Sequence, residues 1–432
     1  MARGGVQAME ANGIDAMLRH KRVLAASLIG TAVEFYDFYI YATAASLVFG
    51  PLFFPASSPS AQLMAAYGSL ALAFFARPLG AAVFGHYGDR IGRKATLVTS
   101  LMLMGASTLA IGFLPTYQMI GWWAPLILCI LRFGQGFGLG GEWGGAALLA
   151  VENAPPGWRA RFGMFPQLGA PVGFLAANGL FLILGMFLTD EDFFAWGWRL
   201  PFLGSAVLVF LGLWVRLKLS ETPEFAAAQA EAPPPALPLA TLFSHHLGAA
   251  IAGTFAVVAC FAVYYIATAF ALGYGTTTLN IGRETFLAIQ LGAILFMALS
   301  IIIAGWWADK TSPTRVLVAG CIGTVLMGVI FGPAMGTGQL LPIFLILSLA
   351  LFLMGFVYGP LGAYLPHLFP VQLRYTGASF SFNLGGILGG ALAPIVATWL
   401  IQVQGVELVG LYMSAAAAIS LGGLWFTSRN PA

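Results

Sequence analysis

The sequence predicts an all-α polytopic membrane protein with twelve transmembrane helices in two six-helix halves. Only 8% of the 432 residues are Asp, Glu, Lys or Arg, and the mean hydropathy is +0.87. A soluble domain carries roughly 25% charged residues, so this chain could not cover a water-exposed surface. Apolar stretches long enough to cross a bilayer recur along nearly the whole chain. One long polar, proline-rich interruption separates them into two groups of six.

The twelve expected spans follow from the apolar runs. Helix is the expected conformation because unpaired strand edges cannot face lipid, and the runs are longer than the strands of membrane barrels. The first run contains Glu34 and Asp37 and lacks a small-residue cleavage site, so we expect a retained helix rather than a signal peptide. The expected helices cover residues 23–49, 61–84, 95–115, 123–150, 162–187, 199–219, 247–273, 284–307, 314–334, 339–366, 374–403 and 405–427.

The polar interruption sets the domain boundaries. Its composition, with Pro233, Pro234, Pro235 and Pro238 in an alanine-rich tract, is typical of a linker. Two halves of similar length are typical of transporters built from repeats, whose site lies between them. The predicted divisions are an N-terminal segment 1–22, a bundle 23–219, a linker 220–246, a bundle 247–427 and a tail 428–432.

The distribution of Lys and Arg predicts the orientation. Placing the N-terminus in the cytoplasm puts nearly every loop Lys and Arg on that side, and only Arg199 and Arg283 fall outside. The positive-inside rule therefore predicts a multi-pass protein of the cytoplasmic (inner) membrane with both termini cytoplasmic.

Composition also excludes several classes of partner. The formal charge of +3 comes from short basic clusters between apolar runs, so we expect the lipid bilayer as partner and no nucleic acid. The three cysteines lie singly in apolar runs, which gives no disulfide framework. No spacing of His, Cys and acids predicts a metal site, and we expect no cofactor and a monomer.

One loop carries an unusually dense pattern of glycine and charge. Residues 85–94 read GHYGDRIGRK, and a partial copy, GWWADK, stands at residues 305–310. Glycines permit a tight turn between helices, and Asp89 among arginines can form charge-assisted hydrogen bonds at a helix end. The alternative is a solvated positive loop. The offset of the second copy, with Asp309, indicates an internal repeat.

The loop at residues 85–94 resembles the hallmark cytoplasmic loop of the major facilitator superfamily at every position. Further strings are similar to its metabolite:proton symporter branch: EFYDF at 34–38, RPLG at 77–80, RFGQG at 132–136, GGEWGG at 140–145, GWRLPF at 197–202, YGP at 358–360, RYTG at 374–377 and NLGG at 383–386. The chain departs from such relatives at His367 and Gln372, where they tend to carry Glu and Arg. The resemblance implies proton-coupled transport, with the gating residues Gly85, Asp89, Arg90, Gly92, Arg93, Arg161, Asp309 and Arg374.

Few ionisable side chains lie inside the predicted spans, where each costs several kcal/mol, roughly 2.5–3.5 on insertion scales. Glu34 and Asp37 lie on one face of the first helix, and Arg132 and Glu142 share the fourth. Neighbouring acids raise each other's affinity for protons, and a nearby Arg lowers it. We expect Asp37, then Glu34 and Glu142, to carry protons, while Arg132 neutralises them or binds a substrate carboxylate. The alternative is a static Asp37–Arg132 ion pair.

Polar-tipped side chains in other spans are candidates for the substrate site. Tyrosines inside spans suit a central cavity, although any one of them is more often a packed residue with a satisfied hydroxyl. The predicted substrate-binding residues are Arg132, Gln135, Tyr264, Tyr265, Tyr358 and Asn383.

These observations favour a secondary active transporter that takes up a small organic acid or zwitterion, shikimate-like or another carboxylate, together with protons. A proton-coupled exporter or antiporter is the alternative. A channel would need a selectivity filter or a ring of charges, and an enzyme or sensor would need a nucleophile with its base or a soluble domain. No Walker phosphate loop is present, so ATP is not the expected energy source.

Overall fold

The computed structural model describes residues 13–55, 58–91, 93–140, 142–218, 238–370 and 373–429. The predicted N-terminal segment, linker and tail therefore lie partly outside the described residues. The part of the linker that is described begins with a short helix, α13 (Pro238–His245).

The first half contains the six spans expected from the sequence. Its first span runs without interruption through an α-helix, a π-helix and a final α-helical turn, and the fourth span consists of two consecutive helices. Short helices α6 (Tyr117–Ile120) and α10 (Asp190–Ala195) lie between spans. The span elements are α2 (Lys21–Ala44), η1 (Ala45–Phe49), α3 (Gly50–Phe53), α4 (Pro59–Ile91), α5 (Arg93–Phe113), α7 (Trp123–Leu139), α8 (Glu142–Glu152), α9 (Arg159–Phe187), η2 (Gly197–Arg199) and α11 (Leu200–Lys218).

The second half repeats this plan. Its first span again contains a π-helix and its fourth span again consists of two helices, while its fifth span contains a π-helix that the first half lacks at that place. The elements are α14 (Leu247–Tyr265), η3 (Ile266–Phe270), α15 (Ala271–Thr277), α16 (Arg283–Lys310), α17 (Pro313–Gly336), α18 (Leu340–Tyr358), α19 (Leu361–His367), α20 (Arg374–Gly386), η5 (Ile387–Ala391), α21 (Ala393–Val403) and α22 (Glu407–Arg429).

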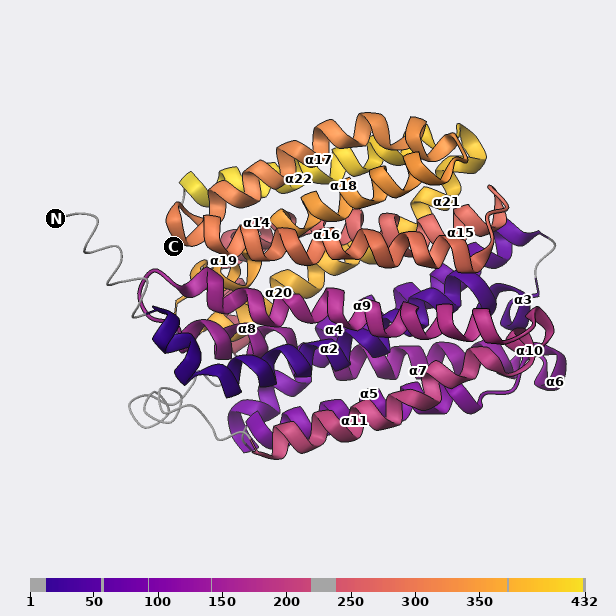
Figure 1. Ribbon diagram of the computed structural model, residues 1–432. Helices are drawn as coiled ribbons and strands as arrows, with labels where there is room; N and C mark the ends of the chain where they lie inside the picture. The colour runs from indigo at the N-terminus through magenta and orange to yellow at the C-terminus, as the bar shows by residue number, and fades with distance from the viewer. Residues whose placement is uncertain are drawn as a thin grey trace.

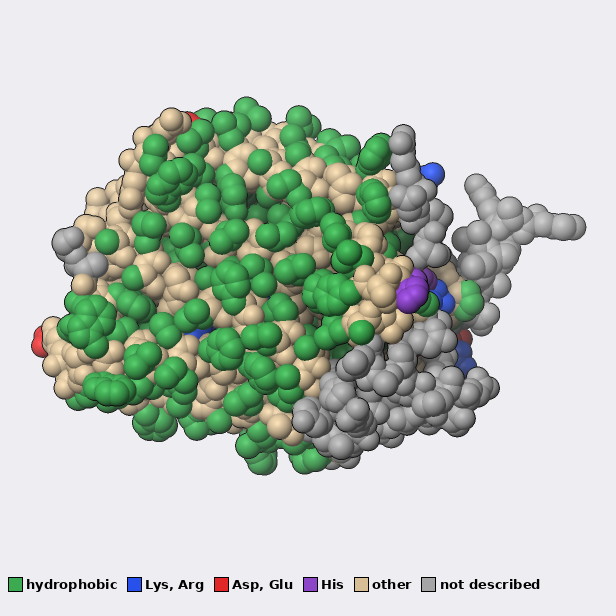
Figure 2. Space-filling model, turned by 180° about the vertical axis from the view of Figure 1, so that it is seen from behind, with side chains coloured by type: hydrophobic (Ala, Val, Ile, Leu, Met, Phe, Trp, Pro, Cys, Tyr) green, Lys and Arg blue, Asp and Glu red, His purple; other side chains and the backbone are tan. Residues whose placement is uncertain are grey.

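The predicted fold class is confirmed. Within the described residues, eleven helical segments are long and apolar enough to cross a membrane, and α5 adds a shorter apolar helix, Val98–Phe113. The two halves form two stacked layers of helices, and the start of α2 lies at the same end of the bundle as the end of α22 (Figure 1). The face seen in Figure 2 is covered largely by hydrophobic side chains, as lipid contact requires.

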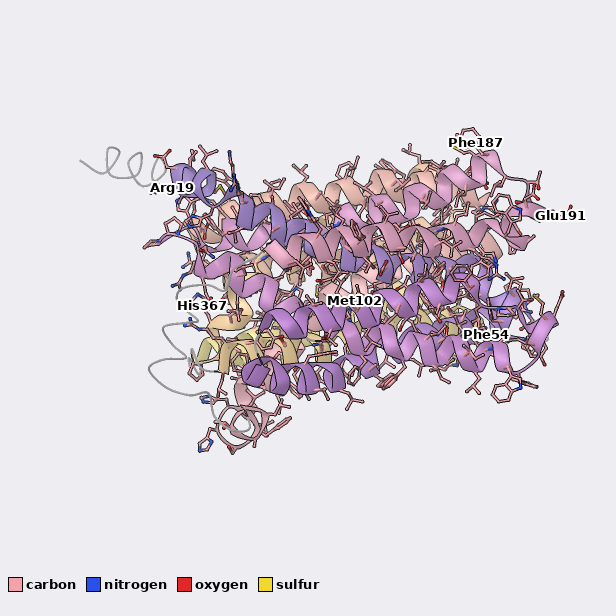
Figure 3. The ribbon with its side chains drawn as sticks, turned by 90° about the horizontal axis from the view of Figure 1, so that it is seen from below. Arg19, Phe54, Met102, Phe187, Glu191 and His367 are labelled. Atoms are coloured by element: carbon pink, nitrogen blue, oxygen red, sulfur yellow. The ribbon has the colours of Figure 1, made fainter. Side chains whose placement is uncertain are left out.

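The two ends of the bundle differ in charge, and we name them accordingly. Arg19 and His367 lie at one end and Glu191 at the other (Figure 3). The first, the basic end, also carries the cationic end of α16 and the start of α9. The other is the acidic end, where the first turn of α10 contains Asp190, Glu191 and Asp192.

The π-helices η1 and η3 support the internal repeat. They begin at Ala45 and Ile266, almost the same separation as that between the two loop motifs. A π-turn loosens the helical ladder and is frequent at functional sites. The Gln290 amide nitrogen donates to the Ala267 and Thr268 carbonyls of η3, at 3.1 and 2.8 Å.

Candidate functional site

The candidate site lies where the halves meet, in the middle of the bundle. Across this boundary α9 packs on α16, and α4 packs on α20 and η5. In the first half, α7 approaches α4 very closely, because a Cβ added at Gly136 or Gly140 would overlap the backbone of Ala73 or Arg77. Small residues at such crossings bring the side chains that flank them close together. They place Arg132 of α7 and Arg77 of α4 around one site.

Asp37 and Arg132 are joined by a chain of hydrogen bonds rather than by a direct ion pair. Arg132 Nη1 donates to Gln135 Oε1 at 2.9 Å, and Gln135 Nε2 donates to Thr108 Oγ1 at 2.7 Å. The Thr108 hydroxyl donates to Asp37 Oδ2 at 3.2 Å. Asp37 is 1% exposed and Arg132 0%. Among the described residues no carboxylate forms an ion pair with Arg132, so the static Asp37–Arg132 pair that the sequence left open is not formed.

The two buried guanidinium groups rest on aromatic rings. Arg132 lies 4.1 Å from the ring centre of Phe38 and 4.0 Å from that of Tyr41. Arg77 lies 4.5 Å from the same Phe38 ring and 5.0 Å from that of Phe74. Such cation–π contacts stabilise a desolvated cation by about 2 kcal/mol. They do not satisfy its N–H groups, and within the described part of the chain Arg132 Nε and Nη2 and Arg77 Nε have no hydrogen-bond partner.

Glu34 lies one turn before Asp37 on α2 and is also buried, at 6% exposure. Its carboxylate is near enough to Arg77 to interact with it electrostatically. Glu142, the third predicted proton carrier, lies outside the described side chains. Glu34, Asp37, Arg77 and Arg132 thus gather around one site in the first half.

The second half covers this site with aromatic side chains. Tyr264 stacks on Tyr39, with ring centres 5.1 Å apart, and Tyr265 meets Phe38 and Phe74 edge-on. The rings of predicted residues Tyr264 and Tyr265 therefore lie against the site.

Two other predicted substrate residues, Tyr358 and Asn383, contact the first half. The Asn383 amide donates to the Gly140 carbonyl at 3.0 Å, and Gln167 Nε2 donates to the Tyr358 carbonyl at 2.7 Å. The Gln167 carbonyl oxygen in turn accepts a hydrogen bond from Trp143 Nε1 at 3.1 Å. Trp143 stacks on Phe382 of the second half. The Asn383 side chain is therefore engaged in a contact between the halves. The Gln135 side chain is engaged in a hydrogen bond with Arg132 inside the first half.

A small, mainly apolar pocket lies beside Tyr39 and Tyr264. Its cavity volume is about 10 Å³, room for about one water molecule. The side-chain amide nitrogen of Gln290 donates to η3. The side-chain oxygen of the same amide, Oε1, is buried and has no hydrogen-bond partner among the described residues. The lining residues are Tyr39, Ala42, Thr43, Phe174, Asn178, Tyr264, Thr268, Ala269, Leu272 and Gln290. The sequence analysis missed Thr43, Asn178 and Gln290, although polar residues inside apolar runs were a signal for them.

Two predicted gating residues meet at the basic end and join the halves. Asp309 at the end of α16 accepts hydrogen bonds from the backbone N–H groups of Ala160 and Arg161, at 2.8 and 3.0 Å, at the start of α9. Its Oδ2 also lies 3.4 Å from Arg161 Nε. The Arg161 guanidinium is sandwiched between Trp158 and Trp306, 4.1 Å from each ring centre. An anion at a helix N-terminus is favourable, so this contact holds the halves together.

A second contact at the basic end involves His367. Arg159 Nη1 lies 3.1 Å from His367 Nε2 across the boundary between the halves. Together with Arg374, another predicted gating residue, they line a pocket of about 300 Å³. The remaining predicted gating residues, Gly85, Asp89, Arg90, Gly92 and Arg93, lie outside the residues whose side chains are described.

The acidic end also joins the halves. The hydroxyls of Ser46 and Tyr67 donate to the Ala269 carbonyl of η3, at 3.0 and 2.6 Å. Arg283 Nη2 pairs with Asp190 Oδ1 at 3.0 Å. Within the described residues, contacts therefore join the halves at both ends of the bundle.

Comparisons of sequence place this chain among known transporters. The family model described as "Sugar (and other) transporter" matches residues 23–233. The inner membrane metabolite transport protein YhjE of Escherichia coli K12 is 49% identical, covering 95% of this chain and 94% of its own. The shikimate transporter of the same strain is 37% identical, covering 94% of each chain. A putative proline/betaine transporter of Staphylococcus aureus COL is 32% identical, covering 94% of this chain and 88% of its own.

Comparison of structures agrees with the fold. The proton:xylose symporter XylE bound to 6-bromo-6-deoxy-D-glucose matches with a TM-score of 0.72 over 95% of each chain, at 15% identity. A partially occluded inward-open form of XylE from E. coli matches with a TM-score of 0.71, over 95% of this chain and 97% of that one.

Proposed function

Because this chain belongs to the sugar and metabolite transporter family of the major facilitator superfamily, we propose that it imports a small organic acid or zwitterion together with protons. Its relatives are transporters rather than enzymes. In this proposal the substrate carries a carboxylate, and the two halves expose the central site to each side of the cytoplasmic membrane in turn.

The observation that carries the proposal is the pair of buried guanidinium groups that form no ion pair with any carboxylate among the described residues. A buried cation costs several kcal/mol unless it is paired. Arg132 keeps two nitrogens and Arg77 one nitrogen without a hydrogen-bond partner. A substrate carboxylate supplies the missing charge and the missing acceptors, and guanidinium groups suit bidentate binding of carboxylates. The anionic end of the substrate therefore binds between α4 and α7.

Neutral groups receive the rest of the substrate. Tyr264 and Tyr265 offer ring faces and hydroxyls, and the pocket beyond Tyr39 and Tyr264 offers the free carbonyl oxygen of Gln290. The pocket in its closed form is smaller than the roughly 300–1,000 Å³ typical of ligand sites, so the halves separate there when substrate enters. Hydroxyl groups or an ammonium group on the substrate would match this lining.

Asp37 is the proposed proton carrier, with Glu34 and Glu142 as further candidates. Asp37 is buried, and the hydrogen-bond chain links it to Arg132. A proton on Asp37 removes the negative charge that partly balances the arginines, which strengthens their attraction for an anionic substrate. Proton and substrate then cross together.

The contacts at the two ends provide the gates of this cycle. In the proposal the basic end faces the cytoplasm, as the positive-inside rule requires, so both termini are cytoplasmic. Asp309, Arg161 and Arg374 close the cytoplasmic side, and Ser46, Tyr67 and Arg283 close the outer side. Because one chain supplies the whole site and both gates, a monomer suffices for transport.

Binding and uptake measurements test this function. Purified protein would be screened by thermal shift against shikimate, 2-oxoglutarate, citrate, proline and betaine, and the best ligand would be used for uptake into proteoliposomes. We expect saturable uptake driven by an inward proton gradient and abolished by an uncoupler. Uptake driven only by an outward proton gradient would indicate antiport instead, and uptake that ignores the gradient would refute proton coupling.

A further inference from the structure

We propose that Thr108 and Gln135 form a hydrogen-bond relay of fixed polarity that transmits the protonation of Asp37 to the substrate-binding guanidinium of Arg132. This inference rests on the proposed function, because it explains how a proton and a carboxylate bound at separate residues are coupled. It gives Thr108 a role in positioning, and it makes Gln135 the support of Arg132 rather than a substrate ligand.

The polarity of the relay follows from the chemistry of Arg132. A guanidinium group only donates hydrogen bonds, so the Gln135 atom that it contacts must be the carbonyl oxygen. The Gln135 amide nitrogen must then face Thr108 Oγ1, which accepts. The amide orientation is therefore set by the network and cannot be reversed. Because Thr108 Oγ1 accepts from Gln135, the hydroxyl hydrogen of Thr108 must donate to a different group that can accept it.

Two acceptors lie within hydrogen-bond distance of the Thr108 hydroxyl, which can donate to only one of them at a time. Its Oγ1 lies 3.2 Å from Asp37 Oδ2 and 2.9 Å from the Met104 carbonyl one turn earlier in α5. An ionised Asp37 attracts the hydrogen because hydrogen bonds to a charged acceptor are the stronger ones. A protonated Asp37 is a weaker acceptor, and the hydrogen turns to Met104. Thr108 is thus a two-position switch that responds to the proton.

The relay aligns every donor from Arg132 toward Asp37. Hydrogen bonds in a chain polarise one another, so an anion at one end strengthens the hold on the cation at the other. When Asp37 is protonated the hold weakens, and the Arg132 guanidinium becomes free to turn its unpartnered nitrogens toward a carboxylate. The other ionisable groups around this pair, among the described residues, are Glu34, Tyr36 and Tyr41 on α2, Arg77 on α4, Cys129 on α7 and Tyr265 on α14.

The four relay residues belong to three helices of one half. Asp37 lies on α2, Thr108 on α5, and Gln135 and Arg132 on α7. Relative movement of the two halves therefore leaves the relay intact. It can report the proton in every conformation of the cycle.

Infrared titration of the purified protein tests the relay without knowing the substrate. The carboxyl band of protonated Asp37 is identified as the band that Asp37→Asn removes, and its intensity is followed against pH. Thr108→Val keeps the shape but removes the hydroxyl that stabilises ionised Asp37. In the Thr108→Val variant we expect the midpoint of the Asp37 titration to move upward by about one pH unit, a tenfold change in proton affinity. In the Thr108→Ser variant we expect this midpoint to stay near the wild-type value.

A double-mutant cycle separates a relay from two local effects. Gln135→Met breaks the link to Arg132 and should also move the midpoint upward. If both residues belong to one chain, Thr108→Val/Gln135→Met shifts it no further than Thr108→Val alone. Additive shifts, no shift in Thr108→Val, or equal shifts in the Val and Ser variants would overturn the relay. Thermal melting shows which variants are folded, and because no substrate is added, failure here is distinct from failure of proton-coupled uptake.

Discussion

The two halves contribute opposite kinds of chemistry to the surface between them. Among the described residues, the charged residues buried in the middle of the bundle all belong to the first half: Glu34, Asp37, Arg77 and Arg132. The second half meets them with tyrosines, amides and hydroxyls, as at Tyr264, Tyr265, Gln290 and Asn383. At the ends of the bundle the pattern changes, because Asp309 and Arg283 of the second half pair with the first half.

This difference has a mechanical consequence. Ion pairs across the middle of the bundle would have to break in a low dielectric each time the halves moved, at a cost of several kcal/mol. Neutral aromatic contacts can slide at smaller cost. The charged groups that we propose bind substrate and proton therefore all remain in one half. Charge contacts between the halves are kept at the ends, where water can replace them when a gate opens.

The strongest test removes the proton carrier from the charged half. Asp37→Asn imitates the protonated state permanently, so substrate still binds and exchanges. We expect pH-driven net uptake to fall to the level of empty liposomes while counterflow in proteoliposomes continues, because exchange needs no net proton movement. Full pH-driven uptake by this variant would exclude Asp37 and move the role to Glu34 or Glu142. Loss of both activities would instead indicate that Asp37 holds the site together.

The next test compares charged and neutral contacts with the substrate. Arg132→Lys keeps the charge but loses the planar, bidentate donor geometry and the stacking on Phe38 and Tyr41. We expect ligand affinity to fall by about 2 kcal/mol, near thirtyfold, as is usual for a charged hydrogen bond. Tyr265→Phe on the neutral side should cost about 1 kcal/mol or less. Isothermal titration with the best ligand measures both, and a larger loss at Tyr265 would reverse the assignment.

A third test addresses the charged contact at the basic end. Asp309→Asn retains one acceptor for the α9 backbone but leaves the buried Arg161 without its carboxylate. We expect the closed basic end to be destabilised by a few kcal/mol, and a cysteine placed at Val151, buried between the halves, to label more rapidly. Asp190→Asn is the matched control, since its pair with Arg283 lies at the acidic end. Equal labelling of wild type and Asp309→Asn would contradict a gate at Asp309.

Hydropathy was sufficient to predict the spans, because lipid contact restricts each span to an apolar helix. The same reasoning singled out Asp37 and Arg132, whose burial is costly wherever it occurs. It could not predict how they are connected. A threonine in a span most often bonds its own helix, as Thr254 does, so nothing in the sequence distinguished Thr108. The rotation of each helix decides which polar side chains meet, and the apolar periodicity leaves this rotation undetermined.

The smallest expected effect lies at the other contact of the basic end, between Arg159 and His367. A guanidinium only donates, so His367 Nε2 must be unprotonated to accept. A protonated imidazole cannot accept, and it would bring a third positive charge beside Arg159 and Arg374, which line the same pocket. Partial burial and the neighbouring Arg159 and Arg374 lower the pKa of His367 below its usual value of about 6.5, so the basic end should loosen only when the pH falls below that value. The contact is exposed, and its loss should change the rate of opening by about fivefold at most.

His367→Gln separates this effect from proton coupling. The carbonyl oxygen of the introduced glutamine accepts from Arg159 at every pH, so the gate should no longer respond to acid. The measurement is maleimide labelling of Val151→Cys, in a background without the native cysteines and carrying Asp37→Asn, so that the coupling site does not titrate. We expect labelling to quicken only as the pH falls below about 6.5 when His367 is present, and to stay constant in the His367→Gln variant. An identical acid response in both would show that His367 is not the group that senses pH, and would leave Asp309 as the principal contact that closes this end.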